Sequence, residues 1–145
     1  MNRRGFTLME LIVTIGIIGL LAVIGLPRIG DAFRKQSVVS AKAAVVSLHA
    51  AARANAVQRA YSTFLVIDGN TLRMYSRDPL TGSLQQIGND SDLGDRYGVA
   101  VSATRDTLWF DPRGLGMETS STRITLTKGV YTQTVEISSL GRVQQ

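Results

Sequence analysis

Residues 6–26 read FTLMELIVTIGIIGLLAVIGL, an apolar run in which Glu10 is the only ionisable side chain. A helix of about twenty residues, rising about 1.5 Å per residue, is about 30 Å long, which matches the hydrocarbon core of a bilayer. Arg3 and Arg4 stand immediately before the run. The sequence therefore predicts a membrane helix to which the rest of the chain is attached.

Glu10 is unusual in this run because a charged side chain in lipid costs a few kcal/mol or more. It lies about one helical turn after Phe6. A cut between Gly5 and Phe6 would create an α-amino group of opposite charge nearby. The residues leave two interpretations open: Glu10 pairs with such an amine, or its carboxylate reaches the lipid headgroups from near the helix end.

Glycine interrupts the apolar run at Gly16, Gly19 and Gly25, and Pro27 follows it. Small residues let membrane helices approach closely, and Gly16 and Gly19 are three positions apart. Glycine and proline also weaken or bend a helix. Close packing against like helices is the favoured interpretation, and the general enrichment of glycine in membrane helices is the alternative.

The remainder of the 145-residue chain suits one small domain. Cysteine is absent, so no disulfide stabilises that domain. The net charge of +5 is concentrated before residue 60, because residues 28–59 carry six basic side chains against one acidic side chain. From residue 60 onward eight basic side chains face nine acidic ones, which argues against a basic nucleic-acid-binding domain.

Residues 28–59 are rich in alanine and have the composition of a helix. Their apolar residues fall on two stripes rather than the single stripe that a surface helix needs. The first stripe comprises Ala41, Val45, Leu48 and Ala52, the second comprises Val39, Val46, Ala50 and Val57, and His49 is placed in a basic gap between them with Lys35, Lys42 and Arg53. We expect one stripe to pack on the chain's own sheet and the other on neighbouring subunits. A single broad core face is the alternative.

The apolar period changes from helical to alternating after Tyr61. Strands are predicted at 61–67, 72–76, 97–103, 107–110, 123–128 and 131–138, with hairpins at Gly69-Asn70 and Gly129, and residues 78–95 are predicted to form a loop. The predicted fold class is α+β. A long N-terminal helix, with a transmembrane half and an amphipathic half, packs on a small antiparallel β-sheet or sandwich.

A short basic leader ending in Gly5, followed by Phe-Thr-Leu-x-Glu-Leu at residues 6–11 and an apolar helix, resembles the class III signal of type IV pilins and pseudopilins. The resemblance implies that a prepilin peptidase cuts between Gly5 and Phe6 and methylates the new Phe6 amine. It also implies that Glu10 pairs with the N-terminal amine of a neighbouring subunit during filament assembly.

The C-terminal half resembles the GspH/FimT group of minor pseudopilins. Residues 109–114 read WFDPRG, two strand patterns follow, and the chain closes on Gly141-Arg142-Val143, matching that group's Phe-x-Pro-x-Gly turn, two long strands and terminal Gly-Arg. In DNA-uptake members, a Gly-Arg-x-Arg element is implicated in DNA binding. Here Gln144 stands at the second arginine, which leaves Arg142 as the candidate DNA contact and weakens that interpretation.

Catalysis finds little support, because the chain has no cysteine and one histidine, so neither a Cys/His pair nor a histidine-based metal cluster can form. Asp90, Asp92 and Asp95 could suggest a calcium loop. The segment lacks the glycine position and the distant glutamate of an EF-hand, which favours a solvated acidic loop. No catalytic residue, cofactor or metal site is predicted.

The resemblance implies a minor pseudopilin subunit of a type II secretion pseudopilus. A FimT-like minor pilin, acting in pilus biogenesis or DNA uptake, is the alternative. Prepilin peptidase, other pseudopilins or pilins in a hetero-oligomeric filament, and the inner membrane are the implied partners, and DNA is a less favoured one.

Four segments follow: a leader at 1–5, a transmembrane or filament-core helix at 6–27, an amphipathic helix at 28–60 and a periplasmic β domain at 61–145. Basic residues flank both ends of the apolar run, so charge alone does not decide the orientation. The resemblance implies a single-pass bacterial inner-membrane protein with a cytoplasmic N-terminus. A cleaved secretory signal and a plain anchor with an unrelated β domain are the rival interpretations.

Overall fold

The computed structural model describes residues 6–144, and the chain divides into two units, Met1–Arg34 and Lys35–Gln145. Helix α1, Leu8–Arg59, runs for 52 residues and belongs to both units. It ends where Ala60 adopts a left-handed φ of 54° and its N–H bonds the carbonyl of Val57. A left-handed residue closes many helices, although alanine is less suited to that conformation than glycine.

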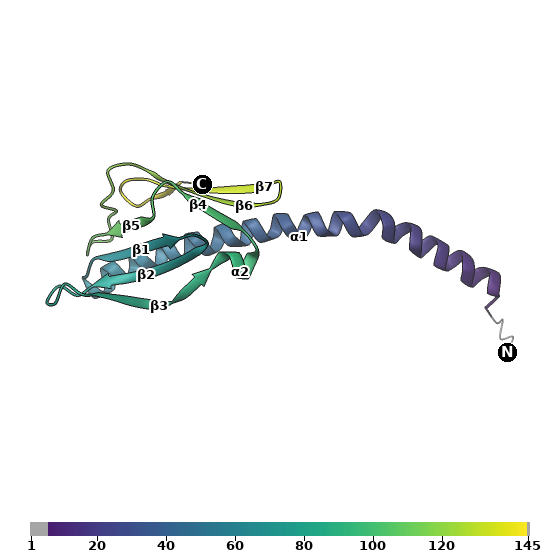
Figure 1. Ribbon diagram of the computed structural model, residues 1–145, viewed down its shortest axis with the longest axis horizontal. Helices are drawn as coiled ribbons and strands as arrows, with labels where there is room; N and C mark the ends of the chain where they lie inside the picture. Colours follow the sequence, from purple (N-terminus) through teal and green to yellow (C-terminus); the bar gives the residue numbers. More distant parts are fainter. Residues whose placement is uncertain (1–5, 145) are drawn as a thin grey trace. The chain divides into compact units, whose positions relative to one another are not determined.

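Two four-stranded antiparallel sheets make up most of the second unit and lie along the C-terminal part of α1 (Figure 1). The first sheet has the order β3-β2-β1-β5, with β1 at Thr63–Asp68, β2 at Thr71–Arg77, β3 at Leu84–Asp92 and β5 at Thr107–Phe110. The second has the order β4-β6-β7-β8, with β4 at Ala100–Ala103, β6 at Thr122–Lys128, β7 at Tyr131–Ile137 and β8 at Val143–Gln144. A short helix α2, Leu93–Tyr97, precedes β4.

Both predicted hairpins are confirmed by the strand register. Asp68 pairs with Thr71 across Gly69-Asn70, and Lys128 pairs with Tyr131 across Gly129-Val130. Glycine supplies the positive φ that each tight turn requires, 57° at Gly69 and 63° at Gly129. The predicted α+β architecture, a long N-terminal helix packed on antiparallel sheets, is likewise confirmed.

The predicted loop at 78–95 is wrong from residue 84 onward. Residues 84–92 form β3, the edge strand beside β2, and residues 93–97 form α2, so the predicted strand 97–103 begins only at Ala100. Strand β3 is mostly exposed, has no fully buried residue and lacks an apolar alternation. It pairs with β2 through backbone bonds and through side-chain bonds such as Arg73 Nε to Asp90 at 2.8 Å.

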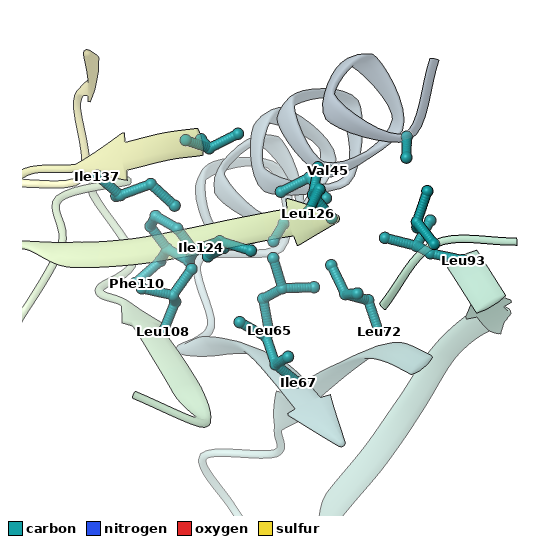
Figure 2. Close-up of a cluster of buried hydrophobic side chains, with 14 of the residues drawn as sticks. Val45, Leu65, Ile67, Leu72, Leu93, Leu108, Phe110, Ile124, Leu126 and Ile137 are labelled. Atoms are coloured by element: carbon teal, nitrogen blue, oxygen red, sulfur yellow. The ribbon is translucent and has the colours of Figure 1, made fainter. Parts of the chain in front are cut away.

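One hydrophobic core joins the helix to both sheets (Figure 2). In Figure 2 the buried side chains from α1, β6, β1 and β2 meet in this core: Val45, Ile124, Leu126, Leu65 and Leu72. All five are fully buried. A buried aliphatic side chain contributes about 1.5–3 kcal/mol, so this shared core holds the amphipathic part of α1 against both sheets.

Candidate functional site

The first apolar stripe of α1 is the face that the second unit buries. Ala41, Val45 and Ala52 are fully buried and Leu48 is half-buried, as predicted. The structure extends this stripe to Val38 and Ala56.

His49 also lies on the buried face, with 3% of its surface exposed, so its predicted place in the basic gap is wrong. Its ring meets the ring of Phe110 edge-on, with 5.1 Å between centroids. Burial, together with Arg53 one turn further along, lowers the pKa of the His49 imidazole below its usual value.

The second apolar stripe of α1 remains largely uncovered by this chain. Val39 is 41% exposed and Val57 is 52% exposed, Ala50 is exposed, and Val46 is half-buried and touches the core. Two shallow grooves follow the stripe, one lined by Val39, Lys42, Ala43, Val46, Ser47 and Ala50 and the other by Ala50, Arg53, Ala54, Val57 and Gln58. The two predicted stripes are therefore distinct, and the second is accessible to another molecule.

The apolar part of α1 exposes its side chains all around the helix. Its most apolar 18-residue window has a mean hydropathy of 2.5 and none of it is buried, so by length and composition this helix can cross a membrane. A β-carbon added to Gly16, Gly19 or Gly25 would meet nothing within 4 Å. The chain's own fold therefore gives no packing reason for these glycines.

Glu10 stands in the first turn of α1 and helps to begin the helix. The Thr7 hydroxyl oxygen accepts the Glu10 N–H at 3.2 Å, and the Thr7 carbonyl accepts the Leu11 N–H. Thr-x-x-Glu at a helix start is a capping box, and a carboxylate there also favours the helix dipole. Within residues 6–144 no cation pairs with the Glu10 carboxylate. Phe6 is 71% exposed, and Gly5 lies outside the described residues.

The segment 110–116 is built around Asp111. The Asp111 carboxylate accepts the N–H groups of Arg113 and Leu115 at 2.9 and 2.8 Å and also pairs with the Arg113 guanidinium. These hydrogen bonds, chiefly the one from Leu115, hold the pKa of Asp111 below its usual value. Gly114 adopts a φ of 76°, and an added β-carbon there would lie 2.8 Å from Val57 Cγ2, which places this turn directly on α1.

The Gly141-Arg142 segment packs on the same turn through two glycines. An added β-carbon on Gly116 would lie 2.6 Å from the Gly141 nitrogen, and the Gly116 N–H bonds the Leu140 carbonyl at 3.1 Å. The Arg142 N–H donates to the Ser138 hydroxyl at 3.0 Å, and Arg142 is exposed. The segment 110–116 and the Gly141-Arg142 segment are thus in close backbone contact at Gly116 and Gly141.

Two of the three acidic residues of 90–95, Asp90 and Asp92, are engaged in structural contacts. Asp90 pairs with Arg73, and Asp92 caps α2 by accepting the Asp95 N–H at 2.9 Å. These bonds lower the pKa of Asp90 and of Asp92. Among the described residues no group of three His, Cys, Asp or Glu side chains is arranged to hold a metal.

Known proteins resemble the chain along nearly its whole length. Residues 1–26 match the prokaryotic N-terminal methylation motif, and residues 41–141 match the family described as type II transport protein GspH. The pilin-like protein PilA1 of Thermus thermophilus is 29% identical over 99% of both chains.

Two solved structures share the fold. The type IV minor pilin FimU of Pseudomonas aeruginosa has a TM-score of 0.61 at 17% identity, covering 76% of this chain and 88% of that one. The minor pseudopilin EpsH of the Vibrio cholerae type 2 secretion system has a TM-score of 0.57 at 12% identity, covering 73% and 92%. Because the GspH model spans most of the sequence, the chain belongs to the GspH family, a family of structural, non-enzymatic pseudopilins.

Proposed function

We propose that the chain is a minor pseudopilin subunit of a type II secretion pseudopilus. The observation that carries the proposal is the uncovered helix surface: an apolar segment exposed all around, glycines with open space, and a second apolar stripe on α1. Exposed apolar surface of this extent needs either lipid or other subunits. The helix lies in the inner membrane before assembly, with the N-terminus in the cytoplasm and the β domain in the periplasm, and then packs with like helices.

Processing between Gly5 and Phe6 by prepilin peptidase is the first step of the proposal, and the methylation motif at residues 1–26 supports it. We expect intact-mass analysis of the membrane-extracted protein to show the loss of residues 1–5 and the gain of one methyl group. Gly5→Leu, expressed in parallel, should keep the full mass. An unshortened wild-type chain in cells that contain the peptidase would overturn the proposal.

Glu10 is the proposed assembly carboxylate, which pairs with the Phe6 amine of a neighbouring subunit. The capping role of Glu10 requires its backbone N–H, which every substitution except proline keeps. Glu10→Gln should therefore leave the helix start intact and abolish incorporation into filaments, whereas Glu10→Asp should retain part of it. Asp31→Asn, which changes another exposed acid of α1, is the matched control. Normal assembly of Glu10→Gln would show that filament assembly does not require the Glu10 charge.

The second stripe is the proposed lateral contact in the filament. Val39 is a sharper test position than Val46, because Val46 also touches the core. We expect Val39→Asp to fold normally and to reduce co-purification with the filament about tenfold or more. Val130→Asp, at an 89% exposed valine of the β6–β7 turn, should assemble like the wild type. Equal assembly of both variants would exclude the stripe from the interface.

A type IV pilus role with DNA binding is the second candidate. The FimU fold and the similarity to PilA1 support a pilus-type subunit, and exposed Arg142 supports a DNA contact. A gel-shift titration of the full chain distinguishes the two functions. Salt-sensitive, micromolar DNA binding that Arg142→Ala removes would favour DNA uptake, and the secretion proposal predicts no such binding.

A further inference from the structure

The outer face of the first sheet carries a row of large side chains aligned across neighbouring strands. Phe64 of β1 pairs with Tyr75 of β2 on one side and with Trp109 of β5 on the other. A bridge between Phe110 and Gly116 extends the row to Met117, whose N–H bonds the Trp109 carbonyl at 3.0 Å. Side chains alternate along each strand, so all four lie opposite the core face.

These side chains form a pre-ordered ridge. The rings of Phe64 and Trp109 stack with centroids 5.7 Å apart and planes 22° apart. The Arg77 guanidinium lies 5.7 Å from the centre of the Phe64 ring. Phe64, Tyr75, Arg77, Trp109 and Met117 are called the aromatic ridge below. Stacking already restricts the rotamers of these side chains. Binding of a partner therefore costs less side-chain entropy at the ridge than it would at mobile side chains.

Arg77 is the cation that the ridge offers to a partner. Arg73, four residues earlier on β2, already pairs with Asp68 at 2.7 Å and Asp90 at 2.8 Å. Arg77 has no carboxylate partner among residues 6–144 and is exposed. Trp109 and Met117 are 39% and 50% exposed. The ridge therefore combines accessible apolar surface with one uncompensated positive charge.

The stacking geometry argues against nucleic acid as the occupant. Bases bind aromatic residues through free ring faces. Strand β1 lies between β2 and β5, and both Arg77 and Trp109 already lie against the Phe64 ring. The combination of Trp, Tyr, Met and Arg is instead the one enriched at the centres of protein interfaces.

We propose that the aromatic ridge is a docking surface for a different protein, one that presents an extended segment of apolar side chains beside a carboxylate. The apolar side chains cover Trp109 and Met117, and the carboxylate pairs with Arg77. A symmetric contact between the ridges of two copies fits less well, because the ridge itself contains no acidic residue to meet Arg77. The surface is formed by strands of the first sheet together with Met117, and it is independent of the filament contacts proposed for α1.

Trp109 is the only tryptophan of the chain, so its fluorescence reports on the ridge directly. The probes are two short peptides with the same leucine-valine core, one flanked by glutamate and the other by lysine, and a single-stranded oligothymidylate. Each is titrated into the full chain in lipid nanodiscs while the Trp109 emission maximum is followed. We expect a saturable blue shift with the glutamate peptide and none with the other two probes.

Charge reversal assigns the site. Arg77→Glu should weaken binding of the glutamate peptide about tenfold and allow the lysine peptide to bind. Arg77→Gln should give an intermediate loss. Arg96→Glu, at an exposed arginine of α2 that lies over the Tyr97 ring and outside the ridge, should behave like the wild type. An unchanged melting temperature shows that each variant is folded. Absence of binding, binding insensitive to both Arg77 variants, or a preference for the oligonucleotide would each overturn the proposal.

Discussion

His49 is the only histidine of the chain and lies in the core of the β-domain unit, beyond the apolar segment at 6–27. Its Nε2 has no hydrogen-bond partner among the described residues, and its ring packs on Phe110. Protonation would bury an uncompensated charge beside Arg53, and for this reason the pKa of folded His49 is lowered. Folding should therefore become weaker as the pH falls.

The direction and the maximum size of this loss of stability follow from the difference between the unfolded and folded pKa of His49. Above the unfolded value of 6.5 both states are neutral and His49 gives no pH dependence. Below it the unfolded chain binds the proton first, and stability falls by about 1.36 kcal/mol per pH unit until the pH reaches the lowered folded pKa. At about pH 5 the loss is thus at most about 2 kcal/mol, a large share of the 5–15 kcal/mol that is typical of a domain.

Urea unfolding of the chain in detergent micelles, followed by Trp109 fluorescence between about pH 7.5 and about pH 5, measures this loss. His49→Leu, which fills a similar volume without a titrating group, should be at least as stable near neutral pH and independent of pH over this range. Arg53→Gln should reduce the slope, because it removes the neighbouring cation. If His49→Leu kept the wild-type pH dependence, the reasoning would be refuted.

Two further predictions concern the segment 110–116. Gly116→Ala should destabilise the fold by about 2–4 kcal/mol in urea unfolding, because its β-carbon would collide with the Gly141 backbone, whereas Gly129→Ala, which meets open space at a positive φ, should cost only about 1–2 kcal/mol. Equal losses would show that steric approach is not what Gly116 provides. Asp111→Asn should lower the melting temperature near neutral pH, and the difference from the wild type should narrow as the pH falls below 3.8 toward the lowered pKa of Asp111. A difference that stays constant with pH would show that the Asp111 charge is not responsible.

The sequence predicted the parts of the fold in which burial follows a simple period. Alternating residues such as Leu65 and Ile67 located β1. The helical spacing of Ala41, Val45 and Ala52 placed them on one stripe of α1, and the structure shows that this stripe is the buried one. Strand β3 was missed because its residues are polar and exposed, and its pairing depends on backbone bonds and on Arg73. Pairing of this kind is a tertiary property that no local pattern encodes.

The candidate sites also differ in how far the sequence could predict them. The Phe6–Glu10 region was identified by a local motif, and its Thr7–Glu10 spacing could also have indicated the Thr7 hydroxyl cap that the structure shows. The environment of His49 could not be predicted, because it depends on Phe110, a residue brought to α1 from a distant strand. The aromatic ridge could likewise not be predicted, because its members are aligned only by the register of three strands and by one bridge.

Strand β3 has a consequence for the filament assembly proposed above. As the outermost strand of its sheet it offers a backbone edge to which another chain could add by strand pairing. The register shifts opposite Arg73, where Gly88 adopts a φ of 74°, and Asp90 and Asp92 place negative charge along the edge. A bulged, charged edge is a poor template for a further strand. Uncontrolled sheet extension is thereby suppressed, and growth of an assembly is left to side-chain surfaces that can select their neighbours.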